Sequence, residues 1–164
     1  MKILTIAIPS YNSMDYMRNC IESLLPGGED VEILIVDDGS KDDTPAIADE
    51  YQEKYPGIVR AIHQENGGHG EAVNAGLRNA TGFFYKVVDS DDWVDAESYQ
   101  KILAFLKEAM KEEEPLDMLL SNYVYEKVGA KHKKVIQYHS ILPENRYFGW
   151  DEIGHFHASQ NILM

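Results

Sequence analysis

The 164-residue chain carries 28 Asp and Glu against 15 Lys and Arg, which gives a formal net charge of −13. This excess argues against a nucleic-acid-binding protein, which needs a basic face to neutralise phosphates. It also argues against unaided docking on an anionic membrane surface. Hydrophobic residues make up 44% of the chain, as in an ordinary folded domain. A polyanionic ligand therefore has to be held locally, by a metal ion or by backbone amides.

Cys20 is the single cysteine, which excludes an intrachain disulfide framework and a multi-cysteine zinc site. A reducing, intracellular compartment fits this composition. The apolar run over residues 3–8 is too short for the core of a signal peptide, and no run of about 18 apolar residues is present. We therefore expect a cytoplasmic chain.

The first elements are predicted from apolar runs and helical spacing. Residues 3–8 form a continuous apolar, β-branched run, which predicts a strand buried on both faces of a parallel sheet and ended by Pro9. Apolar residues at helical spacing then predict a helix that begins with Asn12 or Ser13 as N-cap and ends before Pro26. A second buried strand is predicted over residues 31–36.

The next elements repeat this alternation. Thr44 as N-cap and Pro45 as first helical residue predict a helix to about residue 55. A strand over residues 58–62 follows. The glycine-rich stretch 66–70 then leads into a helix, after which Gly82 is expected as the C′ residue.

A fourth strand is predicted over residues 83–88 and a long helix over about residues 95–113. Four alternations of strand and helix predict an α/β domain with a mostly parallel sheet. Residues 116–128 and 133–139 are expected to form two further strands joined by a turn at residues 129–130. We expect a single domain over residues 1–164 that is truncated, because the apolar residues 162–164 carry no stop signal.

Acidic residues and glycines follow the predicted strands. In parallel α/β sheets, ligands bind beyond the carboxyl ends of the strands. Asp89, Asp91 and Asp92 place three carboxylates within four residues at such an end, where they repel one another unless a hard cation lies among them. Mn²⁺ or Mg²⁺ suits this site, because these ions combine carboxylates with phosphate oxygens. The alternative is an acidic loop that improves solubility or caps the next helix.

The other strand ends carry groups suited to a nucleotide. The carboxylate of Asp38 is able to accept from a base N–H or a ribose hydroxyl, whereas Asp37 has an alternative role in an Asx turn. Tyr11 offers a ring for stacking on a base, and packing is the alternative. The loop 66–70 lets backbone amides approach an anionic ligand, with His69 as a further candidate contact.

Four motifs together resemble a known family. IAIPSYN, ILIVDDGSKDDT, NGGHGEAVNAG and VVDSDDW, in this order, resemble the N-terminal half of the inverting family 2 glycosyltransferases over residues 3–93. The resemblance implies a GT-A type fold, in which a mostly parallel sheet carries helices on both faces as three layers. It also implies a nucleotide-sugar-binding half over residues 1–95 and the start of an acceptor half, incomplete, over residues 96–164.

The resemblance also implies roles for particular residues. Pro9 and Tyr11 would line the base, and Asp38 would contact uracil or its ribose. Gly68 and Asn74 would belong to the loop and helix beside the nucleotide. Asp89 and Asp91 match the family's Asp-x-Asp motif, which holds the ribose and the metal, and Asp92 would share the metal. One departure is Val73, where many relatives carry Arg. A cationic phosphate contact is therefore expected to be missing.

The implied reaction transfers a sugar from a nucleotide donor, UDP being favoured, to an acceptor hydroxyl with inversion and metal assistance. A carboxylate base must take the acceptor proton, and we expect it beyond residue 164. These residues alone are thus expected to bind nucleotide but to transfer sugar poorly. By resemblance, we expect a saccharide or lipid-linked acceptor in cell-envelope polysaccharide or glycolipid synthesis. The reaction would take place at the cytoplasmic face of a membrane, with which the protein would associate through a part outside residues 1–164.

Three other functions are alternatives to a glycosyltransferase. A dinucleotide-binding oxidoreductase is disfavoured, because the glycine stretch lacks its third glycine at Val73 and follows the third strand instead of the first. A nucleotidyltransferase would need a Gly-rich, basic loop after the first strand, where this chain has residues 9–12. A catalytically silent nucleotide-binding module stays open, and a downstream acidic base would distinguish it from a transferase.

Overall fold

The computed structural model describes residues 1–114, 116–126, 133–138 and 142–152. The chain divides into two compact units, Met1–Leu116 and Asp117–Met164. Each unit is described by itself.

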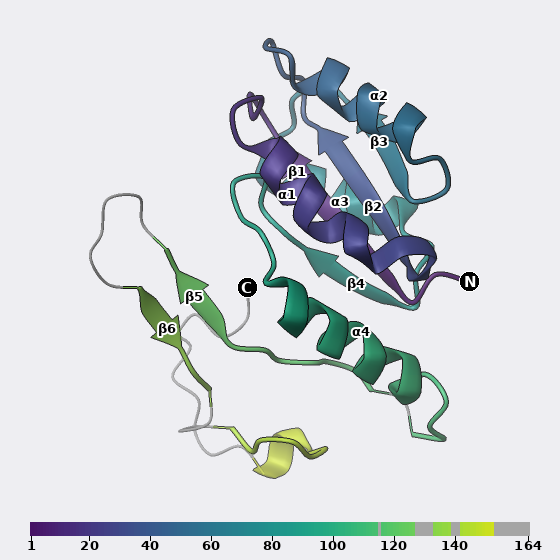
Figure 1. Ribbon diagram of the computed structural model, residues 1–164, viewed down its shortest axis with the longest axis vertical. Helices are drawn as coiled ribbons and strands as arrows, with labels where there is room; N and C mark the ends of the chain where they lie inside the picture. Colours follow the sequence, from purple (N-terminus) through teal and green to yellow (C-terminus); the bar gives the residue numbers. More distant parts are fainter. Residues whose placement is uncertain (115, 127–132, 139–141, 153–164) are drawn as a thin grey trace. The chain divides into compact units, whose positions relative to one another are not determined.

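The first unit is built on a four-stranded sheet in the order β3-β2-β1-β4. Its strands are β1 (Leu4–Ser10), β2 (Val31–Asp37), β3 (Val59–His63) and β4 (Phe84–Val87), and all three pairings are parallel (Figure 1). Every residue of β1 and β2 is buried, as expected of apolar runs in central strands. The strand order reverses at β1, which has β2 on one side and β4 on the other.

Four helices complete the unit, namely α1 (Met17–Leu24), α2 (Thr44–Lys54), α3 (His69–Asn79) and α4 (Ala96–Ala109), with a 3₁₀ segment η1 (Leu25–Asp30) before β2. Ile6 and Ile8 of β1 pack in the main core with residues of α1, α2 and α4. On the opposite face, Val36 packs with Ala72 and Ala75 of α3. Helices therefore cover both faces of the sheet (Figure 1), which confirms the predicted three-layer α/β class.

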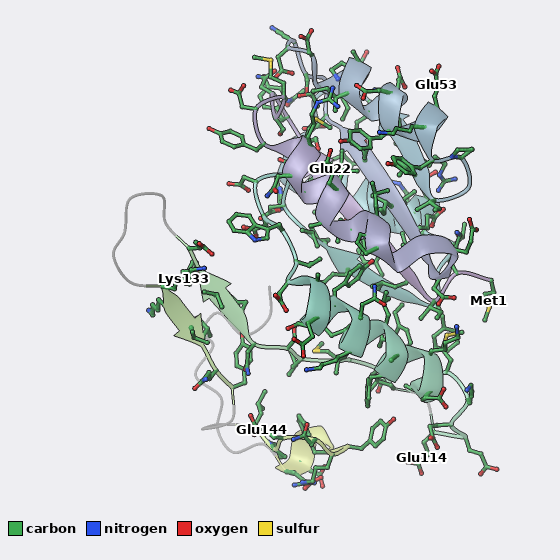
Figure 2. All side chains as sticks on the ribbon, in the orientation of Figure 1. Met1, Glu22, Glu53, Glu114, Lys133 and Glu144 are labelled. Carbon is green, nitrogen blue, oxygen red and sulfur yellow. The ribbon has the colours of Figure 1, made fainter. Side chains whose placement is uncertain are left out.

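Charged side chains occupy the outer surfaces of these helices. Glu22 on α1 and Glu53 on α2 are exposed (Figure 2). Because apolar residues fill the inner faces, the large negative charge is carried at the solvent side, where it costs little.

Several element boundaries differ from the prediction. β1 continues through Pro9 to Ser10. Helix α1 begins at Met17, with Tyr16 as N-cap. Ser13 Oγ, the atom that an N-cap uses, instead accepts from the N–H of Tyr11 and lies 2.8 Å from Ser90 Oγ, and the N–H of Ser13 donates to Thr44 Oγ1 at 2.8 Å. Thr44 is itself helical and Asp43 is the N-cap. The predicted N-cap roles of Asn12, Ser13 and Thr44 were therefore wrong.

The long fourth helix is shorter than predicted but has a well-formed start. Asp95 caps it by accepting a hydrogen bond from the N–H of Ser98, at 2.9 Å. The helix ends at Ala109, and the acidic residues 112–114 that follow are exposed. Three like charges in one turn repel one another, which gives a physical reason for the early end.

Gly82 has a different role from the predicted helix end. Helix α3 ends at Asn79, and its C-cap is Ala80 in an extended conformation. Gly82 instead lies against β1, where its N–H donates to Thr5 Oγ1 at 2.8 Å. A Cβ atom at this position would lie 2.5 Å from the backbone nitrogen of Thr5. Glycine is needed here for close approach of two backbones.

We expect Gly82→Ala to destabilise the protein by about 1–3 kcal/mol, the usual range for overpacking. The clash is with backbone, so no side chain is able to move aside. Gly70→Ala is the matched control, because nothing lies within 4 Å of a Cβ atom there. Urea unfolding of both variants measures the difference. Equal stability of the two would contradict this role for Gly82.

The second unit contains β5 (Tyr123–Tyr125) and β6 (Lys134–Ile136), which pair antiparallel, and a 3₁₀ turn, η2 (Trp150–Glu152). Both strands are shorter than predicted. The turn expected at residues 129–130 lies outside the described residues. Within the described part of the chain, no helix has the length and apolar character needed to span a membrane.

Candidate functional site

The four parallel strands end at one edge of the sheet, and the loops that follow them are held together by backbone hydrogen bonds. The N–H of Asp38, after β2, donates to the carbonyl of Ser10 at 2.9 Å. The N–H of Gln64, after β3, donates to the carbonyl of Asp37 at 3.0 Å. The polar residues that follow neighbouring strands therefore lie at the same edge, which is where parallel α/β sheets bind ligands.

Side chains fasten the loop after β1 to the loop after β2. Asn12 has a positive φ of 51°, which asparagine tolerates better than most residues. In this conformation its N–H donates to Ser40 Oγ at 3.0 Å, and its Oδ1 accepts from the N–H of Lys41 at 2.9 Å. The strained residue is therefore fixed from both sides.

Ser13 connects this loop to the acidic turn after β4. Its Oγ lies 2.8 Å from Oγ of Ser90, the middle residue of the Asp89-Ser90-Asp91 sequence, and accepts from the N–H of Tyr11 at 3.2 Å. Ser13 and Ser90 are 77 residues apart in the chain. This bond joins the loop that carries Tyr11 to the turn that carries the Asp-x-Asp motif.

Asp38 is the most connected carboxylate of the site. Its Oδ1 accepts from Gln64 Nε2 at 2.7 Å and from the N–H of Gly67 at 2.9 Å, while its Oδ2 accepts from the N–H of Gly68 at 2.8 Å. The residue is 3% exposed. Burial acts to raise the pKa of Asp38, but these hydrogen bonds outweigh burial and lower the pKa. Asp38 is thus a buried, ionised carboxylate that fixes the glycine loop to the end of β2.

Asp37 and His63 form a second polar link beneath the site. Asp37 Oδ1 accepts from the N–H of Ser40 at 3.0 Å, three residues on, whereas an Asx turn bonds to the N–H two residues on. The two ring nitrogens of His63 lie 3.0 Å from Asp37 Oδ2 and 3.1 Å from Asp49 Oδ1. A neutral imidazole carries one N–H, so two carboxylates favour the protonated ring. The hydrogen bond to Asp37, supported by Asp49, raises the pKa of His63 against the opposing effect of burial.

We expect His63→Gln to remove a pH-dependent part of the stability. A histidine whose pKa is raised by folding stabilises the protein fully below its unfolded pKa of about 6.5, and the contribution disappears as pH rises through the folded pKa. The parent should therefore exceed His63→Gln in unfolding free energy by more at about pH 6 than at about pH 9. His69→Gln is the control, because His69 Nε2 lies 3.9 Å from Asp89 Oδ1 and is well exposed. A pH-independent gap for His63→Gln would contradict the prediction.

The acidic turn after β4 is partly open to solvent. Asp89, Asp91 and Asp92 are exposed residues, and the N–H of Asp92 donates to the carbonyl of Asp89 at 2.9 Å. Burial, followed by the charges of Asp91 and Asp89, raises the pKa of Asp92. The buried thiol of Cys20 lies below, with its Sγ 3.5 Å from the carbonyl of Asp89. Burial, reinforced by these carboxylates, raises the pKa of Cys20 to about 12, so the thiol stays neutral.

The carboxylates of this turn are of the type that binds a hard divalent cation, but they are not arranged as a complete metal site. The charges of Asp91 and Asp89 contribute to the raised pKa of Asp92, and a cation would relieve this negative potential. However, among the residues that the structure describes, no three His, Cys, Asp or Glu side chains are placed to hold a metal by themselves. The expected set of three ligands is thus not preassembled. A metal here would need phosphate oxygens as well, as Mg²⁺ and Mn²⁺ commonly do.

The remaining predicted residues occupy different parts of this edge. Pro9 is buried within β1, and Tyr11 is 51% exposed just beyond that strand. Gly68 is the N-cap of α3 with a positive φ of 85°, a conformation that suits glycine. Asn74 is an exposed residue further along α3, where its side chain interacts with Glu71.

The site roles of Gln64, His63 and Ser13 were not predicted from the sequence, because the sequence around a polar residue near a strand end does not show which distant residue it will bond. Gln64 bonds to a residue 26 positions earlier, and Ser13 to one 77 positions later. Only the parallel register of the strands brings these partners together.

The sequence matches glycosyl transferase family 2 over residues 5–160. The chain belongs to this family. As a family 2 member it resembles YibD of Escherichia coli strain K12, an uncharacterized glycosyltransferase, with 41% identity over 106 residues that cover 64% of this chain and 30% of YibD.

Solved structures agree with this assignment. TarS 1-349 of S. aureus, solved in complex with UDP-GlcNAc, has a TM-score of 0.59 and 32% identity over 67% of this chain and 32% of that chain. The mannosyltransferase PcManGT from Pyrobaculum calidifontis, solved with GDP-Man and Mn²⁺, shares the fold, with a TM-score of 0.53 and 24% identity over 58% of this chain and 30% of that chain. The chain spans 13–39% of the length of the curated relatives with which it is compared, 30% in the case of YibD.

Proposed function

We propose that this chain supplies the donor-binding part of a glycosyltransferase that transfers a sugar from a UDP-sugar to an acceptor hydroxyl. The observation that carries the proposal is that Asp38 and the Asp89–Asp91 turn are both bonded to the end of β1 and the loop after it, Asp38 through Ser10 and the turn through Ser13 and Ser90. Family membership and the UDP-GlcNAc complex of TarS support it.

Asp38 gives a physical reason for a uracil base. An ionised carboxylate only accepts hydrogen bonds, and each oxygen offers about two acceptor positions. Gln64 and Gly67 occupy both positions on Oδ1, and Gly68 occupies one on Oδ2. The position left on Oδ2 is suited to N3–H of uracil, whereas N3 of cytosine is an acceptor. Tyr11, exposed on the adjoining loop, would stack on the base, and Pro9 lies in the strand before it.

The acidic turn would hold the diphosphate end. Asp89 and Asp91, with Asp92 beside them, would hold Mn²⁺ or Mg²⁺ together with phosphate oxygens, and Asp89 would also contact the ribose. When bound, the metal supplies Lewis-acid stabilisation of the leaving diphosphate. Gly68 and Asn74 flank the nucleotide on the side of α3. Val73 offers no charge to phosphate, so the acidic turn must recruit a cation for this purpose.

The acceptor side is proposed from family membership. We place the carboxylate base that deprotonates the acceptor hydroxyl outside residues 1–164, and reaction at the anomeric carbon would invert its configuration. The acceptor would be a saccharide or a lipid-linked saccharide in cell-envelope polysaccharide or glycolipid synthesis. Work at the cytoplasmic face of a membrane follows from such an acceptor.

Calorimetric titration with UDP tests the proposal. We expect binding in the presence of Mn²⁺ and its loss when the metal is chelated, because the diphosphate meets an acidic turn that repels it without a cation. Absence of UDP binding in both conditions would overturn the proposal.

A further inference from the structure

Gln64 lies at the end of β3 and contacts the carboxylate on which the proposed base recognition depends. Its Nε2 donates to Asp38 Oδ1 at 2.7 Å. The orientation of this amide follows from chemistry, because an ionised carboxylate needs a donor and the Nε2 group is the donor end of a glutamine. Its backbone N–H also bonds to the carbonyl of Asp37, so its position is fixed relative to Asp38.

The glycine loop holds the same carboxylate from the other side. The N–H groups of Gly67 and Gly68 donate to opposite oxygens of Asp38, and Asn66 Nδ2 donates to the backbone carbonyl of Asp38 at 2.9 Å. The carboxylate is therefore unable to rotate without breaking bonds. Of the three donors that the structure shows on the carboxylate of Asp38, Gln64 is the one whose donor belongs to a side chain, so substitution removes it without altering the backbone.

These contacts leave the two oxygens of Asp38 unequal. Oδ1 accepts two hydrogen bonds and Oδ2 accepts one. With Oδ1 open, the carboxylate would be able to present Oδ2 to ring position 3 of a base and Oδ1 to the 4-amino group of cytosine. With Oδ1 filled, Oδ2 alone is left: uracil brings its N3–H donor to that oxygen, whereas cytosine in the same pose brings the N3 acceptor and finds no acceptor for its 4-amino group.

We propose that Gln64 is a positioning residue that sets nucleotide-base specificity by filling Oδ1 of Asp38. This inference rests on the proposed function, since it concerns the base of the donor nucleotide. Gln64 itself need not touch the nucleotide. Its effect is to keep Asp38 ionised, oriented and available at one position.

Gln64→Leu removes the donor and keeps a side chain of similar length. We expect UDP affinity to fall by about tenfold, the effect of one hydrogen bond to a charged group, while CDP affinity stays level or rises. The ratio of UDP to CDP affinity should therefore fall by at least about tenfold. Gln100→Leu is the matched control, because Gln100 Nε2 donates one hydrogen bond to the carbonyl of Pro26, on η1.

A measurement without nucleotide separates this inference from the proposed function. Carboxyl NMR titration of the whole protein follows the pKa of Asp38, which should rise in Gln64→Leu and stay unchanged in Gln100→Leu. UDP and CDP titrations with Mn²⁺ then give the selectivity of the parent and both variants. The expected outcome is a raised Asp38 pKa together with a reduced UDP to CDP ratio in Gln64→Leu alone.

Other outcomes overturn the inference in distinguishable ways. An unchanged Asp38 pKa in Gln64→Leu would show that Gln64 does not control the carboxylate. A parent that prefers UDP and a Gln64→Leu variant with the same preference would overturn the inference and leave the proposed function standing. A parent that binds neither nucleotide would overturn the proposed function and the inference together.

Discussion

Replacing Asp38 by Asn is expected to lower the unfolding free energy by about 1–3 kcal/mol, the cost of a buried hydrogen-bonding group left without a partner. Both carboxylate oxygens of Asp38 accept from backbone N–H groups, one from Gly67 and the other from Gly68. An asparagine must present its NH₂ group to one of these donors in either orientation. The glycine loop is then released from β2, and UDP binding should be lost with it.

Asp95→Asn is the matched control for this substitution. The carboxylate of Asp95 accepts one backbone hydrogen bond, from Ser98, at the start of α4, and asparagine is about as good an N-cap. Urea unfolding should show a much smaller loss for Asp95→Asn. Equal losses of unfolding free energy in the two variants would contradict the role of Asp38 in holding the glycine loop.

The effect of Asp38→Asn should also depend on pH. The pKa of Asp38 is lowered by folding, so its contribution is present above the unfolded pKa of about 3.9 and is lost as pH falls through the folded pKa. The stability gap between parent and Asp38→Asn should therefore be constant near neutral pH and shrink below about pH 4. A gap that grows on acidification would contradict this assignment.

Replacing Asp91 by Asn is expected to weaken Mn²⁺-dependent UDP binding by at least about 100-fold, since loss of a metal-holding carboxylate should exceed the 10–100-fold typical of residues behind the ligands. The fold should be unaffected, because Asp91 is exposed and its charge raises the pKa of neighbouring Asp92. Removing that charge relieves repulsion in the apo protein.

Asp30→Asn is the control for Asp91→Asn. Asp30 pairs with Lys107 at 3.2 Å, on η1 and α4, and its loss should leave UDP binding unchanged. Calorimetry with Mn²⁺ and with a chelator separates the two effects, because parent and Asp91→Asn should behave alike once the metal is removed. An Asp91→Asn variant that binds UDP and Mn²⁺ like the parent would refute the metal assignment.

The sheet could be predicted from sequence because its central strands are continuous apolar runs. β1 and β2 are buried on both faces, and burial of that kind leaves a local pattern. The start of α1 could not be predicted in the same way. Serine is a common N-cap residue, but Ser13 Oγ is bonded to Ser90 Oγ, a partner that only tertiary structure provides.

In the candidate site, too, residues at strand ends were predictable but their bonding partners were not. Asp38 follows the buried strand β2, whereas Asp89 and Asp91 follow β4, which is only partly buried. The parallel topology brings all three to one edge. The contacts that fix these loops were not predictable, because Gln64 bonds to Asp38, 26 residues away, and Ser13 bonds to Ser90, 77 residues away. Gly82 shows the same limit, since its need for glycine arises from β1 and not from the helix before it.

The central claim is that a nucleoside diphosphate lies across the carboxyl edge of the sheet, with its base at Asp38 and its phosphates at the acidic turn. NMR of the isotope-labelled protein with UDP and Mn²⁺ tests this most directly, because the paramagnetic ion broadens signals close to it. The claim predicts that broadening centres on residues 89–92 and requires UDP, and that UDP with Mg²⁺ shifts the signals of Tyr11, Asp38 and Gly67. Broadening centred elsewhere, or UDP-induced shifts that leave these residues unchanged, would contradict it.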